Sequence, residues 1–139
     1  MPTLNSLAKM VAKPIPRMIN PKAHAVVDYA SVGLFLGAAA RFWGRNRRAA
    51  TASLLCGSAE LALMLLTDYP GGVQNVITFR THRDLDYGLA AISAAIPEVL
   101  AFAGDGETKF FRAQGALLTL LGELTQSSTP TRRVRARAA

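Results

Sequence analysis

The hexapeptide His-Ala-Val-Val-Asp-Tyr at residues 24–29 returns as His-Arg-Asp-Leu-Asp-Tyr at residues 82–87, 58 positions later. The same offset relates four further pairs of identical residues: Gly57 and Gly115, Leu63 and Leu121, Leu66 and Leu124, and Thr67 and Thr125. A mostly apolar unit of this length predicts a helical hairpin. Its return predicts two such hairpins in tandem, over about residues 19–67 and 77–125.

Four apolar segments separated by turn residues fill the two units. They cover about residues 23–43, 49–67, 82–103 and 108–125, with a short extended connector at residues 73–79. Helices of about 18 to 22 residues are about 27 to 33 Å long, which matches a bilayer core of about 30 Å. We therefore predict an all-α, four-helix transmembrane bundle over residues 23–126, between basic tails at residues 1–22 and 127–139.

The composition favours a membrane protein over a soluble one. Half of the residues are apolar and 18% are charged, against about 25% charged residues in a typical soluble domain. However, charged residues interrupt three of the segments: Glu60 the second, Glu98 the third, and Arg112 and Glu123 the fourth. A soluble four-helix bundle therefore stays an alternative, although the leucines of the second segment point in all directions, which favours an apolar environment on every side.

The net charge of +7 is concentrated in the two tails. Basic tails around an apolar middle fit cytoplasmic anchors that face anionic lipid, and four spans put both termini on one side of the membrane. The first hairpin loop, with Arg45, Arg47 and Arg48, runs against this orientation. The rival interpretation is a soluble basic helical protein that binds nucleic acid, but the chain has no recognisable nucleic-acid motif.

The repeated His and Asp residues are the candidate functional residues. His and Asp at positions i and i+4 share a helix face, so His24 with Asp28 and His82 with Asp86 form two equivalent pairs at one depth. Glu123 can join this layer. Two His and several carboxylates can hold a divalent metal ion, and two facing His can ligate a haem iron. The simpler interpretation is structural, with hydrogen bonds inside the bundle and no cofactor.

Other polar residues of the segments also need partners. Glu60 lies deep in a Leu-rich segment, where an ionisable side chain should face the bundle interior, in a structural role or on a proton or cation pathway. Tyr29 and Tyr87 follow the repeated Asp residues and are expected to bury their rings at the membrane interface. Thr67 and Thr125 fall near the His–Asp layer.

Nothing in the sequence indicates soluble-enzyme chemistry. The chain contains no P-loop, GxGxxG, GxSxG or HExxH motif. The single cysteine, Cys56, excludes an intrachain disulfide and fits a small packing residue. We therefore expect a protein without catalytic residues.

Several motifs resemble those of a known family. Asn20-Pro21 precedes His24, residues 65–73 read Leu-Leu-Thr-Asp-Tyr-Pro-Gly-Gly-Val, and residues 76–82 read Val-Ile-Thr-Phe-Arg-Thr-His. Over residues 19–126 this pattern resembles small four-span bacterial membrane proteins related to the SPW-repeat family, although Pro97 alone matches the Ser-Pro-Trp motif. The resemblance implies a multi-pass helical bundle in the bacterial inner membrane. It implies no established activity, so no catalytic residue is carried over.

Three functions follow as hypotheses. The first is a non-catalytic structural or accessory subunit that associates through small-residue surfaces with itself or with a larger membrane complex. The second is a metal-, haem- or proton-handling membrane module that uses the His–Asp layer. The third is the nucleic-acid-binding protein.

Overall fold

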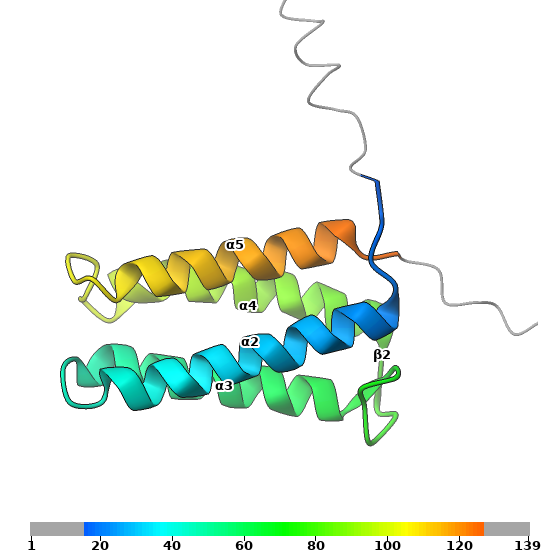
Figure 1. The fold of residues 1–139 in the computed structure, drawn as a ribbon, viewed down its shortest axis with the longest axis horizontal. Coiled ribbons are helices and arrows are strands. Elements are labelled where there is room, and N and C mark those ends of the chain that lie inside the picture. The colour runs from blue at the N-terminus through cyan, green and yellow to red at the C-terminus, as the bar shows by residue number, and fades with distance from the viewer. Residues whose placement is uncertain (1–15, 127–139) are drawn as a thin grey trace, which may run out of the picture.

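The computed structural model describes residues 16–126, so most of the two predicted basic tails lies outside the described residues. In chain order its elements are α2 (Pro21–Phe42), α3 (Arg47–Leu65), β1 (Thr67–Asp68), β2 (Ile77–Thr78), α4 (Phe79–Val99) and α5 (Thr108–Leu124). The four helices lie lengthwise in an elongated bundle (Figure 1). The predicted all-α class with four helices is thus confirmed for this part of the chain.

Side-chain caps explain where three helices begin. Asn20 accepts a hydrogen bond from the Ala23 amide ahead of α2, and Asn46 accepts one from the Ala49 amide at α3. Thr78 does the same at the start of α4. Because of this cap, α4 begins three residues before the predicted start at residue 82, within the stretch expected to be extended.

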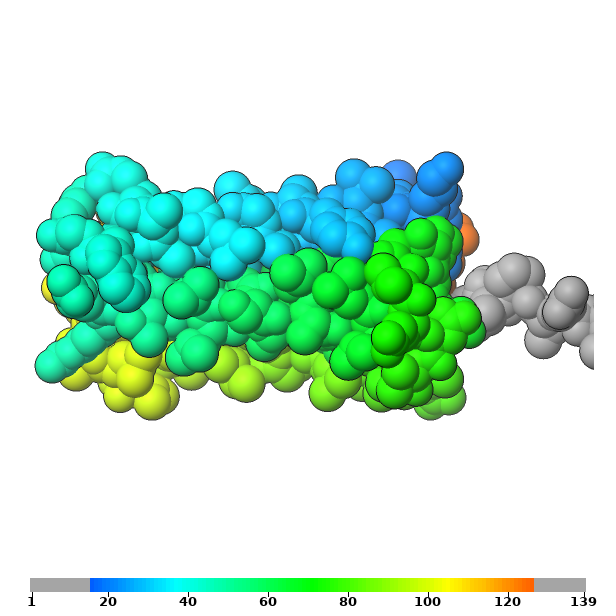
Figure 2. Space-filling model, turned by 90° about the horizontal axis from the view of Figure 1, so that it is seen from below, coloured from blue at the N-terminus to red at the C-terminus, as the bar shows by residue number. Residues whose placement is uncertain are grey.

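The helices form two antiparallel hairpins, α2 with α3 and α4 with α5, and α3 also contacts α4. Figure 2 shows α2 and α3 side by side along the molecule. Gly57 and Gly115 allow this close approach. A Cβ atom at Gly57 would lie 2.9 Å from the Phe35 Cβ, and one at Gly115 would lie 2.8 Å from the Ala90 carbonyl oxygen.

In two short parallel pairings, the end of one hairpin pairs with the segment that precedes the first helix of the other hairpin. Strands β1 and β2 pair with Thr67 opposite Ile77, and an isolated bridge joins Ile19 to Thr125. The two pairings correspond under the 58-residue offset, with the roles of the hairpins exchanged. They fix Thr67 and Thr125 at the same end of the bundle as the starts of α2 and α4.

The interior of the bundle is unusually polar. Buried polar or charged residues lie on all four helices and at their ends: His24, Asp28, Ser31, Ser53, Glu60, Thr67, His82, Asp86, Ser93, Glu107, Thr108, Gln114 and Thr125. Large apolar side chains lie on the outside, among them Val26, Leu34, Leu54, Leu55, Leu85, Ile92 and Leu120. By length and composition, two of the helices, α2 and α3, could cross a membrane.

Candidate metal centre

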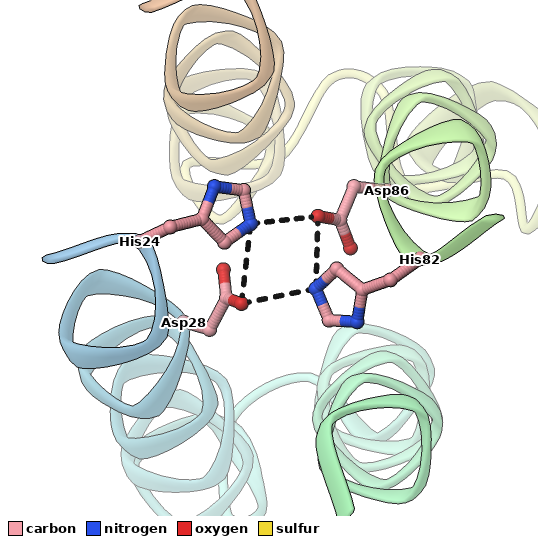
Figure 3. Close-up of side chains that lie close together, drawn as sticks. All are labelled: His24, Asp28, His82 and Asp86. Carbon is pink, nitrogen blue, oxygen red and sulfur yellow. Dashed lines mark hydrogen bonds and ion pairs between the residues drawn. The ribbon is translucent and has the colours of Figure 1, made fainter. Parts of the chain in front are cut away.

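The repeated His and Asp residues meet on the axis of the bundle. His24 and Asp28 lie in the first turns of α2, and His82 and Asp86 lie in the first turns of α4 (Figure 3). All four side chains are buried, with at most 1% of their surface exposed. The i, i+4 spacing directs both members of each pair to the same interior face of their helix.

Nitrogen and oxygen atoms alternate around a closed ring (Figure 3). The His24 Nε2 lies 3.2 Å from the Asp86 Oδ2 and 3.3 Å from the Asp28 Oδ2. The His82 Nε2 lies 3.1 Å from the Asp28 Oδ2 and 3.2 Å from the Asp86 Oδ2. Each His thus contacts the Asp of its own helix and the Asp of the other hairpin. These four atoms, which we call the His–Asp ring, all lie within 4.8 Å of one another.

Two threonines set the orientation of the imidazoles. The Thr67 hydroxyl donates its single proton to the Leu63 carbonyl oxygen at 2.6 Å, so towards the His82 Nδ1, 2.8 Å away, it can only accept. Hence we assign a proton to the Nδ1. Thr125 donates to the Leu121 carbonyl oxygen and lies 2.8 Å from the His24 Nδ1 in the same way. In a neutral imidazole the lone pair then resides on Nε2, which faces the ring.

This arrangement allows two electrically neutral states of the ring. If both imidazoles carry a second proton, two positive rings alternate with two carboxylates. If both are neutral, two Nε2 lone pairs and two carboxylates converge without a proton between them, and a divalent cation restores neutrality. An ion with four bonds of about 2.0–2.1 Å sets neighbouring ligands about 2.8–3.4 Å apart, the lower end for square-planar and the upper end for tetrahedral geometry, and the edges of the ring are 3.1–3.3 Å.

Each aspartate has a second oxygen for which the structure provides no partner. The Asp28 Oδ1 and the Asp86 Oδ1 are both buried and accept no hydrogen bond from the described residues. Buried carboxylate oxygens are rarely left without a partner. A metal ion that binds carboxylates through both oxygens, or that carries a water molecule, would supply one.

Two aromatic side chains cover the ring at the end of the bundle. The Phe79 ring contacts His24 edge-on at 5.2 Å between centroids, and the Tyr69 ring lies 5.0 Å from His82. The Tyr69 hydroxyl also donates to the Asp28 Oδ2 at 3.3 Å. Tyr69 and Phe79 line one side of a surface cavity of about 380 Å³, so they separate the ring from that cavity.

The geometry does not fit haem. Two histidines that share a haem iron lie on opposite faces of a flat macrocycle, which must pass between them. Here the two imidazole centroids are 5.5 Å apart, and both carboxylates occupy the space between the Nε2 atoms. This arrangement therefore gives no support to the alternative of haem ligation.

A second polar layer lies one turn deeper. The Ser31 hydroxyl donates to the Glu60 Oε2 at 3.0 Å, and Gln114 lies 3.5 Å from the same hydroxyl. As predicted, Glu60 faces the interior and has a partner, but its Oε1 has none among the described residues. Ser31 and Gln114 are not among the residues predicted from the sequence. Helical spacing could have identified them. Ser31 lies three residues after the buried Asp28, and Gln114 lies four and seven residues before the buried Leu118 and Leu121, so each shares a helix face with those residues.

Three other predicted residues lie outside the ring. Glu123 is exposed and accepts a hydrogen bond from the Tyr87 hydroxyl at 2.9 Å, so it is no ligand here. Its predicted place is wrong because it lies two residues before Thr125, which turns it to the opposite side of the helix. Tyr29 is not buried as predicted but 42% exposed, because its hydroxyl reaches the Gly71 carbonyl oxygen at the surface. Tyr87 is only half-buried, since its ring lies over Gly122 and its hydroxyl reaches Glu123.

Comparison with known proteins adds no family. No protein-family model matches the chain, and neither a curated protein nor a solved structure matches it significantly.

Proposed function

We propose that this protein is an integral membrane four-helix bundle that binds one divalent transition-metal ion in the His–Asp ring. The alternation of two Nε2 atoms and two carboxylate oxygens at 3.1–3.3 Å carries the proposal. In a purely structural His–Asp network, the two imidazoles would not both need to point their Nε2 atoms to the centre of the ring. The threonines Thr67 and Thr125 produce that direction, as hydrogen-bond partners of the outer nitrogen commonly do in metal sites.

The donor atoms define the class of metal. Two imidazole nitrogens and two carboxylate oxygens suit zinc, iron, manganese and similar ions, whereas magnesium and calcium prefer oxygen ligands alone. The charge supports a divalent ion, because two carboxylates balance two positive charges in a site that is closed to water. A monovalent or a trivalent ion would leave an uncompensated buried charge.

The outer surface supports a location in the membrane. Every exposed residue is uncharged within four stretches, one on each helix: residues 23–40, 49–67, 85–97 and 113–122. Polar residues inside and apolar residues outside suit a bundle surrounded by lipid, where charges face the interior in pairs. The stretches on α4 and α5 are shorter, and beyond them Arg112 and Glu98 neutralise each other in an ion pair of 2.7 Å.

An accessory role in a larger assembly is a second candidate and is compatible with metal binding. A groove between α4 and α5 favours it. Its lining includes Ala90, Ala94, Gly115 and Ala116, and small residues of this kind allow a helix of another subunit to pack closely.

Metal analysis of the protein extracted from carbonate-washed membranes tests the proposal. We expect the protein to stay in the membrane fraction and to carry one metal ion per chain after loading with zinc and dialysis. The double variant His24→Ala, His82→Ala should lose the ion. Substitution of Glu123, which lies outside the ring, is the matched control and should keep it. Extraction of the protein by carbonate would refute the membrane location. Equal metal content in the double histidine variant and in the Glu123 control would refute the metal site.

A further inference from the structure

A second candidate binding site lies beside the metal centre, at the corner where residues 16–20 cross the ends of α4 and α5. A cavity of about 360 Å³ opens there, lined by Arg17, Phe79, Arg80, Arg83 and Asp84. The described residues thus bring three arginines and one aspartate to one cavity.

Backbone hydrogen bonds build this corner. The Ile19 amide donates to the Leu124 carbonyl oxygen at 2.9 Å, and the Gln126 amide donates to the Ile19 carbonyl oxygen at 2.8 Å. The Gln126 side chain also donates to the Arg17 carbonyl oxygen. The Arg83 guanidinium donates to the Gly122 carbonyl oxygen at 2.9 Å, which holds α4 against α5. These contacts hold Arg17 and Arg83 in the segments that line the cavity.

Helix stability does not explain these arginines. Arg80 and Arg83 lie in the first two turns of α4, at the positive end of the helix dipole, where a cation is unfavourable and an anion is favourable. The first turn of α4 contains no acidic residue. The helix dipole would favour a bound anion here, and the exposed Arg80 could donate hydrogen bonds to it, although Asp84 also lines the cavity.

The other hairpin provides an internal comparison. Under the 58-residue offset, Arg83 corresponds to Ala25 and Asp84 to Val26, while Arg80 corresponds to Lys22. The matching cavity beside α2 is lined by Lys22, Ala25, Val26 and Tyr29, with Pro70 and Gly71. The clustered guanidinium groups thus belong to one corner and are not a general feature of both helix starts.

We infer that this corner binds the phosphate of an anionic phospholipid headgroup. The inference rests on the membrane location proposed above. The uncharged outer surface of α4 begins at Leu85, so Arg80 and Arg83 lie just outside it, at the depth of the headgroups. Guanidinium groups bind phosphate through paired hydrogen bonds, and the Phe79 side chain gives the cavity an apolar wall for the adjoining glycerol.

The test is a lipid titration of the detergent-purified full chain, read out by thermal unfolding. Phosphatidylglycerol should stabilise the protein and phosphatidylcholine should not. Arg80→Gln should weaken the apparent lipid affinity about fivefold, as expected for one arginine at a lipid surface. Arg80 is exposed and is suited to substitution, whereas Arg83 also holds α5. Arg41→Gln, an exposed arginine at the other end of the bundle, is the matched control and should leave the affinity unchanged.

Three results would overturn the inference. Equal stabilisation by both lipids would show no preference for an anionic headgroup. Equal weakening by Arg41→Gln would show a general charge effect. Full stabilisation by inorganic phosphate alone would identify free phosphate as the ligand. A protein absent from the membrane fraction would instead refute the proposed function, so the two failures are distinguishable.

Discussion

Replacing Thr67 by valine removes one hydroxyl from behind the metal centre and keeps the shape of the side chain. The hydroxyl joins the Leu63 carbonyl oxygen, at 2.6 Å, to the His82 Nδ1, at 2.8 Å. The variant therefore loses two hydrogen bonds and leaves the buried Nδ1 proton of a fully buried histidine without an acceptor. The lost bond to Leu63 costs about 0.5–1.5 kcal/mol and the unsatisfied Nδ1 donor about 1–3 kcal/mol, so we expect the free energy of unfolding to fall by about 1.5–4.5 kcal/mol.

The same substitution should weaken metal binding. Without Thr67, His82 can adopt the other neutral tautomer, in which Nε2 carries the proton and cannot bind the ion. Loss of such a partner typically costs 10- to 100-fold in metal affinity. A competition titration with a chromogenic zinc chelator measures this change, and chemical denaturation in detergent measures the stability.

Thr119 provides the matched control for this experiment. Its hydroxyl donates to the Gly115 carbonyl oxygen at 2.8 Å, the same i to i−4 bond, and it is exposed and contacts no histidine. Thr119→Val should cost less than about 1 kcal/mol and should leave the metal affinity unchanged. If both valine variants bind zinc equally well, the assigned role of Thr67 is wrong.

Three further predictions concern the ring and the layer beneath it. Asp28→Asn should destabilise the metal-free protein by about 3–5 kcal/mol in denaturation experiments, because it removes one of the two buried carboxylates that face the imidazoles; unchanged stability would contradict a structural role for this carboxylate in the metal-free protein. Metal affinity should fall as the pH falls, because an imidazole binds the ion only through an unprotonated nitrogen; a pH-independent affinity between pH 5 and 8 would exclude the two imidazoles as ligands. Glu60→Gln keeps an acceptor for Ser31 and should change stability by less than about 1 kcal/mol with one metal ion still bound, whereas loss of the ion would place Glu60 among the ligands.

Much of the site could be predicted from helical periodicity. The spacing of His24 to Asp28 places both side chains on one helix face, and the 58-residue offset predicted the same for His82 and Asp86. The structure brings the four together as one layer. The exchange of partners, in which each His also contacts the Asp of the other hairpin, depends on how the two hairpins pack, and periodicity within one helix carries no information about it.

The errors have equally physical causes. Glu123 is expected in the layer because the fourth segment ends at the same depth as the His–Asp pairs, but two residues turn a helix by about 200°, so Glu123 and Thr125 cannot both face the interior. The precise partner of each threonine also escaped prediction, since it depends on the parallel pairing of Thr67 with Ile77 and of Thr125 with Ile19. The pairing of Thr125 with Ile19 joins segments that are distant in sequence. A strand of only two residues leaves almost no recognisable pattern in a sequence.

X-ray absorption spectroscopy of the zinc-loaded protein tests the metal centre most directly. The ring predicts a first shell of two imidazole nitrogens and two carboxylate oxygens at about 2.0–2.1 Å from the ion, and this shell should be absent from the His24→Ala, His82→Ala variant. A shell of water oxygens without imidazole scattering, or the same spectrum from the variant, would contradict a metal site in the His–Asp ring.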